Sequence, residues 1–448
     1  MAEAGRHSRH SRVRRARRRS SRVWPVLLSL ALIAAAVAGG LALHRSSQRA
    51  DGAADGVASA ANVDLAARTA AVDVVLKRRA QAVLAGNETA FLADVDPANA
   101  KLVASQRTLY TNLRQFGFAK LAYQQLAQQY DDSIVQRDGP STYLVAVAMT
   151  YQIRGIDLVP VRAMLGYTFT QRPNGTWMLV SDSDLDKRLP RGSHQEAWDT
   201  GPVLVKRAPR VLVVVEQGQD ALAAKLVTMS VSAVQAVSES WPGSWKGSGV
   251  VIALDDKIVR GADYTQPMNA EDAIAMATWV YRTLPGEVTG AGERADSYVV
   301  INPFNRSKVD ARTLAHEFTH VATAPYGPYA PRWLVEGAAT YVEFLPMTGQ
   351  TKLAIPQYRQ DVRTKYLAKA TSLPVDATFF DHADSSYPLS WLALDYLFTR
   401  FGATEVGTLY REMASLGSTQ KERDRIMLEH VGMTEAGLFA ALKAAAAA

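Results

Sequence analysis

The spacing of apolar residues along the first third of the chain predicts helices. An alanine-rich stretch from Val63 to about Leu84 repeats its apolar residues at helical intervals. Two shorter helical patterns follow, at Glu88–Asp94 and at Ala98–Phe116. We therefore expect the folded part of the chain to open with three helices.

A strand pattern with a period of two follows these helices. Its alternate apolar residues share one face of a predicted strand: Tyr143, Val145, Val147 and Met149. Another strand is predicted near Val161–Gln171, and Asn174-Gly175 joins it to the sequence NGTWMLV, which is a strong hairpin signal. Helices followed by an antiparallel sheet predict a small α+β domain over residues 64–185.

The order and character of these elements resemble the nuclear-transport-factor-like cone, in which a curved sheet wraps long helices. The sequence of this region has no carboxylate pair and no histidine cluster, so a spacer and a ligand-binding module both stay open. The polar residues 186–206 that follow contain proline and glycine and predict a linker.

Residues 207–441 combine apolar strands with a long helical region. Continuous apolar runs at 210–216 and 249–254 predict buried strands, with a helix over Ala221–Trp241 between them. A third strand is predicted at 296–303, and the chain after Asp310 has helical patterns broken by glycine or proline. The fold class predicted for the chain is α+β with a mainly helical C-terminal half.

The net charge of +7 comes from the N-terminus. Residues 1–22 contain nine arginines and one glutamate, a local charge of +8, so the remaining residues sum to −1 by subtraction. We therefore expect no nucleic-acid partner for the folded part, because no excess of basic residues remains there. The absence of cysteine excludes disulfides and thiolate metal ligands.

An uncharged apolar segment, residues 23–43, directly follows these arginines. Its length, at about 1.5 Å per helical residue, matches the hydrocarbon core of a lipid bilayer. The basic tail 1–22 predicts a cytoplasmic N-terminus, so we expect a single-pass membrane protein whose folded part lies outside the cytoplasm. A cleaved signal peptide and a buried core helix are the alternatives. Residues 44–62 are small and polar and predict a flexible linker after the anchor.

The sequence HEFTH at 316–320 carries the clearest chemical signal. Residues four apart lie on one face of a helix, so His316 and His320 can aim imidazole nitrogens at one cation. Glu317 lies about 100° round the helix from His316, as expected for a general base rather than a ligand. Two polar residues on a solvated face are the alternative, but the helix is apolar and unpaired histidines would be costly there.

A third ligand is expected on a later helix. The metzincin arrangement is excluded because Thr323 and Tyr326 stand where it needs glycine and histidine. After a turn-rich segment, the helical sequence RWLVEGAATYVEF places Glu336 sixteen residues beyond His320.

The sequences HEFTH and WLVEGAATYVE resemble the gluzincin zinc peptidases of the MA clan, to which aminopeptidase N belongs. The resemblance covers about residues 296–416, and it implies that His316, His320 and Glu336 bind one zinc ion with Glu317 as general base. The interval between His320 and Glu336 is a few residues shorter than in aminopeptidase N. The Gly-x-Met-Glu-Asn segment that holds a substrate's free amine there is absent from this chain, which favours an endopeptidase or a peptidase of unknown specificity.

The same resemblance implies an edge strand before the metal-binding helix that binds an extended peptide by main-chain pairing. The residues expected on that strand, within 297–302, include Tyr298, Val300 and Asn302. Glu343, seven residues after Glu336 on the same helix face, is expected either to orient a metal-binding histidine or to be a surface carboxylate.

Members of this family use a tyrosine at the start of a later helix to stabilise the negative charge that develops on the substrate oxygen. Tyr387 fits that position and context, with an ordinary aromatic residue at a helix N-terminus as the alternative. His382 is the other candidate for this role, by analogy with thermolysin-like enzymes.

These features together predict a membrane-anchored, extracytoplasmic zinc peptidase that hydrolyses peptide bonds in a peptide or protein substrate. The alternative is a catalytically inactive, zinc-stabilised binding or scaffold protein at the cell surface. A retained Glu317 favours the enzyme, because a structural zinc site needs no base and usually has four protein ligands.

Overall fold

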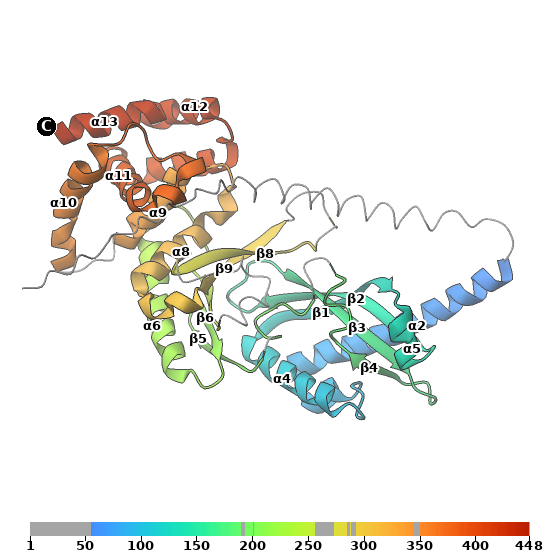
Figure 1. Ribbon diagram of the computed structural model, residues 1–448. Helices are drawn as coiled ribbons and strands as arrows, with labels where there is room; N and C mark the ends of the chain where they lie inside the picture. Colours follow the sequence, from blue (N-terminus) through green and yellow to red (C-terminus); the bar gives the residue numbers. More distant parts are fainter. Residues whose placement is uncertain are drawn as a thin grey trace, which may run out of the picture. The chain divides into compact units, whose positions relative to one another are not determined.

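The protein is a mixed α/β structure with two β-sheets and a helical C-terminal half (Figure 1). The computed structural model describes residues 55–189, 193–199, 201–255, 273–284, 287, 293–344 and 350–447. The chain divides into the units Met1–Ala60 and Ala61–Ala448. The predicted basic tail 1–22 and membrane anchor 23–43 lie outside the described residues.

Four antiparallel strands form the first sheet, in the order β1-β2-β3-β4. The strands are β1 (Phe118–Gln129), β2 (Thr142–Ile153), β3 (Val161–Gln171) and β4 (Trp177–Ser181). The helices of this part are α2 (Asp55–Ala85), α3 (Glu88–Leu92), α4 (Ala100–Phe116) and α5 (Asp132–Asp138). Leu76 and Val83 of α2 are buried in one core with Tyr143 and Val145 of β2, which explains the apolar face of each element.

The predicted helices and the predicted hairpin of this part are confirmed. Gly175 adopts a positive φ of 82° in the turn between β3 and β4, which a glycine adopts without strain. Strand β1 was not predicted, because its glutamine-rich sequence alternates poorly and half of its side chains are exposed. As the outer strand of the sheet it contributes few residues to the core.

Five strands form the second sheet, in the order β5-β6-β7-β9-β8. They are β5 (Val203–Ala208), β6 (Val211–Glu216), β7 (Gly249–Ala253), β8 (Ala275–Tyr281) and β9 (Arg294–Ile301). The central strands β6, β7 and β9 are parallel, and the outer strands β5 and β8 pair antiparallel with their neighbours. The predicted buried strands are β6, β7 and β9, whereas β5 begins at Val203, inside the predicted linker 186–206.

The prediction that residues 297–302 form an edge strand is wrong. Strand β9 pairs with β7 on one side and with β8 on the other, so its backbone has no free edge. Tyr298 is 2% exposed, and Val300 and Asn302 are completely buried. The apolar run SYVVI is typical of an interior strand covered on both faces, and β8 is the edge strand instead.

Both faces of the second sheet are covered. Alternate residues such as Val213 and Val251 pack with the C-terminal helices, whereas Leu212 and Ile252 belong to the same core as the first sheet. A hydrogen bond also joins the second sheet to the part that contains the first sheet: the Tyr298 hydroxyl donates to Asp157 Oδ1 at 3.1 Å. The second sheet therefore lies between the helices and the first sheet, and all three share buried apolar surface.

The helical half follows β9. Its α-helices are α8 (Ala311–Thr323), α9 (Arg332–Phe344), α10 (Gln350–Val362), α11 (Ala383–Leu416), α12 (Gln420–Val431) and α13 (Glu435–Ala447). Short helical turns separate them at η2 (Pro303–Lys308), η3 (Ala324–Tyr326), η4 (Arg363–Leu367), η5 (Asp376–Thr378) and η6 (Phe380–His382). The Asp310 side chain caps α8 by accepting from the Thr313 amide at 2.8 Å, which sets where this helix begins.

One described helix, α6 (Asp220–Ser240), is long and apolar enough to cross a membrane, with a mean hydropathy of 1.4. Its residues Ala223, Leu226 and Val237 are nevertheless buried against the second sheet and α8. A core helix of a globular domain has the same length and composition, so α6 is explained by its packing. The predicted anchor at 23–43 stays a prediction.

The shared core predicts that residues 203–448 are unstable without the part that precedes them. The fragment would expose Leu212, Val214, Ile252 and Val300, whose burial contributes roughly 1.5–3 kcal/mol for each large side chain. We expect the 203–448 fragment to be insoluble or to melt well below the 61–448 fragment in calorimetry. Equal melting temperatures would mean that the two sheets fold independently.

Candidate metal centre

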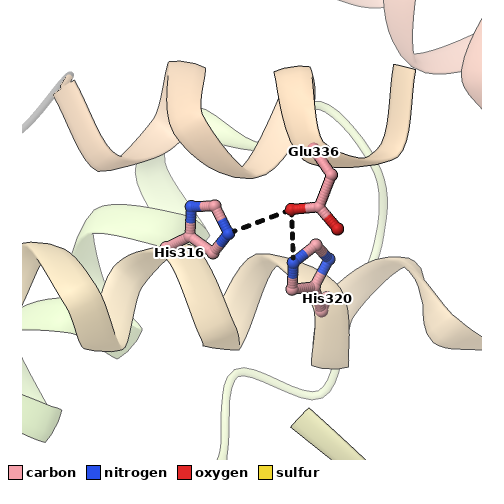
Figure 2. A group of neighbouring side chains, drawn as sticks. All are labelled: His316, His320 and Glu336. Carbon is pink, nitrogen blue, oxygen red and sulfur yellow. Dashed lines mark ion pairs between the residues drawn. The ribbon is translucent and has the colours of Figure 1, made fainter. Parts of the chain in front are cut away.

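Two helices bring three potential metal ligands together. His316 and His320 extend from α8, and Glu336 extends toward them from α9 (Figure 2). Glu336 Oε2 lies 3.4 Å from His316 Nε2 and 3.5 Å from His320 Nε2. One ligand atom from each residue lies within 4.8 Å of the other two. Among the described residues this is the group whose geometry suits a metal ion.

The spacing of these atoms fits a tetrahedral cation. Zinc binds histidine nitrogen and carboxylate oxygen at about 2.0–2.2 Å, so two ligands at a tetrahedral angle lie about 3.4 Å apart. The two nitrogen–oxygen distances, 3.4 and 3.5 Å, agree with that value and exceed the usual length of a charged hydrogen bond. The three side chains can therefore hold a divalent metal ion without rearrangement of either helix.

A glycine sets the position of the third ligand. A Cβ added to Gly337 would lie 2.8 Å from the Ser390 carbonyl oxygen and 2.6 Å from Leu394 Cδ2, both on α11. Only glycine lets α9 approach α11 this closely, because a methyl group would overlap backbone atoms. The residue next to Glu336 thus fixes the depth at which α9 is buried.

Glu343 contacts the ring nitrogen of His316 that faces away from Glu336. His316 Nδ1 lies 3.3 Å from Glu343 Oε2, and Arg312 lies 3.2 Å from the other oxygen of that carboxylate. A carboxylate in this position orients the imidazole and keeps the proton on Nδ1, so that Nε2 is free to bind a metal. The structure thus brings Glu343 to the position that the orienting role requires.

The electrostatic environment favours positive charge at the centre of the group. Burial alone would lower the pKa of His316, but its contacts with Glu336 and Glu343 and the charge of Glu317 raise it to about 10. Burial would raise the pKa of Glu336, but His320 and His316 hold it well below its usual range. Three carboxylates around two imidazoles thus form a site that stabilises a cation.

Glu317 is buried but is not part of the ligand group. It is 7% exposed, and its Oε2 accepts a hydrogen bond of 2.8 Å from the backbone amide of Ala277. Ala277 belongs to the edge strand β8, so the sheet holds this carboxylate in place. No sequence motif marks Ala277, because the contact uses a backbone group that only the fold brings near.

Tyr387 lies in the second turn of α11, close to the metal group. Its ring centroid is 6.1 Å from that of His316 and 5.2 Å from that of Phe379. Burial, followed by the charges of Glu336 and Glu317, raises the pKa of the phenol well above its usual value. Tyr387 is therefore a protonated hydrogen-bond donor near neutral pH.

His382 has a different environment. It is exposed at the N-terminus of α11, and no contact of its imidazole with the metal group is found within the described part of the chain. Of the two predicted donors, the structure brings Tyr387 to the site.

The close approach at Gly337 predicts a coupled loss of stability and metal binding. Gly337→Ala should push α9 away from α11 and displace Glu336, with an overpacking cost of about 1–3 kcal/mol. Zinc titration and thermal unfolding should both show the loss. Gly437→Ala in α13, where the nearest atoms lie at 3.1 and 3.4 Å, is the control and should keep normal zinc affinity. Unchanged zinc affinity in Gly337→Ala would contradict this role.

Comparisons with known proteins give no family for this chain. No protein-family model matches it, and the search of curated proteins finds no match. Its function is therefore inferred from the geometry of the metal group and its surroundings.

Proposed function

We propose that this protein is a zinc-dependent peptidase of the gluzincin type. The observation that carries the proposal is the position of Glu317, a buried carboxylate beside a three-ligand metal group but outside it. A site that only stabilises a fold needs no such group and usually has four protein ligands. Three ligands with an adjacent base are typical of metal-assisted hydrolysis.

The donor set supports zinc. Two histidines and one glutamate form a known ligand set of catalytic zinc, and ferrous iron in oxygenases uses a similar set. A zinc ion bound there would polarise a substrate carbonyl and lower the pKa of water toward about 7. Metal analysis of the purified protein distinguishes the two metals, and we expect zinc in a ratio of one per chain.

Glu317 would act as the general base. Its carboxylate accepts the proton of the attacking water and then donates it to the amine that leaves. The Ala277 amide holds one carboxylate oxygen, which leaves the other for this proton transfer. A base held by the backbone of a sheet needs little reorganisation during the reaction.

Tyr387 would stabilise the transition state. Attack on a peptide carbonyl builds negative charge on its oxygen, and a protonated phenol beside His316 can donate a hydrogen bond to that charge. The raised pKa of Tyr387 supports this role, because a phenolate would repel the developing anion.

The outer edge of β8 would bind the substrate. An extended peptide can add to an edge strand through main-chain hydrogen bonds, and β8 has this edge in place of the 297–302 strand first expected. Ala277 of this strand already contacts Glu317, so a peptide paired there would pass beside the base. This arrangement favours cleavage within a chain, as in an endopeptidase.

The remaining parts of the proposal concern fold and location. The sheet β1–β4 with α2 and α4 supports a nuclear-transport-factor-like cone, and the second part supports a gluzincin catalytic domain. Residues 23–43 and the arginines before them support a single membrane anchor with the enzyme outside the cytoplasm. A reporter fused to the C-terminus should be active only when it is exported.

Glu317→Gln tests the proposed function most simply. The amide cannot accept a proton, so peptide hydrolysis should fall by at least about 100-fold while zinc content and melting temperature stay near wild type. Glu239→Gln, the same change on α6, is the control and should keep full activity. Hydrolysis would be followed with a peptide library and mass spectrometry.

Two outcomes would contradict the proposal. A wild-type protein that binds zinc tightly but cleaves nothing in the library would be the scaffold protein instead. A Glu317→Gln protein that loses its zinc would make Glu317 a ligand rather than the base.

Tyr387→Phe should lower kcat by about 100- to 1,000-fold with little change in KM or zinc content, because the hydrogen bond exists only in the transition state. Tyr329→Phe, in the loop between α8 and α9, is the matched control and should have normal kinetics. Near-normal turnover in Tyr387→Phe with a large loss in His382→Ala would transfer the role to His382.

A further inference from the structure

Three arginines surround a cavity that is formed by residues outside the metal group. Arg114 lies in the last turn of α4, Arg154 lies in the turn after β2, and Arg207 is on β5. Together they line a cavity of about 340 Å³. The rest of the lining is largely apolar: Val83, Leu84, Leu113, Gly117 and Phe118.

The guanidinium groups bond to backbone carbonyls in the described residues. Arg114 donates to the Val83 oxygen at 2.6 Å and to the Leu84 oxygen at 3.3 Å, at the C-terminal end of α2. Arg207 donates to the carbonyl of Phe116 and, at 2.6 Å, to that of Arg154. Each of these carbonyls carries only a partial negative charge, so the three positive charges are not neutralised.

Carboxylates compensate these charges only in part, through the charge of Asp157 near Arg207. Within the described residues no ion pair joins Arg114, Arg154 or Arg207 to an aspartate or glutamate, whereas Arg137 and Arg162 each contact a carboxylate. Burial is the main cause that lowers the pKa of Arg207, and repulsion from the nearby Arg154 guanidinium lowers it further. Because the chain after residue 22 has a net charge of −1, such a concentration of positive charge is not a general property of its surface.

We propose that this arginine pocket binds a phosphate-bearing anion. Guanidinium groups donate paired hydrogen bonds to phosphate oxygens, and three of them match the several charges of a phosphate better than the single charge of a carboxylate. Within the described part of the chain the Arg154 side chain makes one long bond, 3.5 Å to the Phe118 carbonyl, so its other donors can turn to a ligand. All three arginines are exposed, so the anion can reach them from solvent.

The pocket joins the two sheets. Arg114 and Arg154 belong to the part that contains the first sheet, and Arg207 belongs to the second sheet. An anion held by all three would link these parts and relieve the repulsion between Arg154 and Arg207. Binding should therefore raise the melting temperature as the anion concentration rises.

Two sources of the phosphate have the same chemistry, a soluble phosphate compound and an anionic phospholipid headgroup. The first arm of the experiment titrates inorganic pyrophosphate into the full-length protein in a nonionic detergent, with calorimetry as the readout. The second arm compares the protein in lipid nanodiscs with and without an anionic phospholipid. Hydrogen exchange at residues 83–86 and 114–118 then reports protection of the pocket.

Arg154→Gln is the test variant because its loss removes one weak bond of the fold. We expect this variant to bind pyrophosphate about tenfold or more weakly than wild type. If the ligand is a lipid headgroup, we expect the variant to lose the lipid-dependent protection from hydrogen exchange. Arg400→Gln on α11 removes the same charge elsewhere and should leave binding unchanged. The affinity of the wild-type protein for pyrophosphate should also fall as the salt concentration rises, because salt screens the attraction between the arginines and the anion.

Each outcome decides the proposal. Pyrophosphate binding that depends on Arg154 identifies a soluble phosphate ligand, and protection only in anionic nanodiscs identifies a lipid headgroup. Absence of both, equal affinity in wild type and Arg154→Gln, or an equal loss in Arg400→Gln would overturn the arginine pocket as a phosphate site.

Discussion

The contact of Glu336 with His316 and His320 is the constraint on which the helical half depends. It brings one carboxylate and two imidazoles into a largely buried space, where unpaired charge would be costly and where a bound cation would compensate it. The contact requires α8 and α9 to lie side by side, and Gly337 lets α9 settle onto α11. The metal group therefore depends on helix packing, and each helix is fixed by the core behind it.

The second sheet connects the region of the metal group to the first sheet. Its edge strand holds Glu317 through the Ala277 amide, and its far face shares a core with the first sheet. The first sheet thus supports the strand that positions the proposed base, although it contributes no residue to the metal group.

The sequence predicted the elements whose patterns are local and regular. Helix α8, the hairpin between β3 and β4, and the apolar strands β6, β7 and β9 were all recognisable from residue spacing. Strands β1, β5 and β8 were missed because edge strands bury fewer side chains and have weaker periodicity. The strand order was also beyond the sequence, and this is why β9 was taken for the edge. The spacing of the two motifs predicted that His316, His320 and Glu336 form one group. The contact of Glu317 with Ala277 could not be predicted, because it involves a backbone amide that has no sequence signal.

Anomalous X-ray diffraction at the zinc absorption edge, from crystals of the zinc-loaded protein, tests the central claim most directly. The account predicts one anomalous peak about 2.0–2.2 Å from His316 Nε2, His320 Nε2 and a Glu336 oxygen. It also predicts that the fourth position is open to solvent and that Glu317 lies beside it without binding the metal. A fourth protein ligand, a peak coordinated by Glu317, or no peak at these residues would contradict the account.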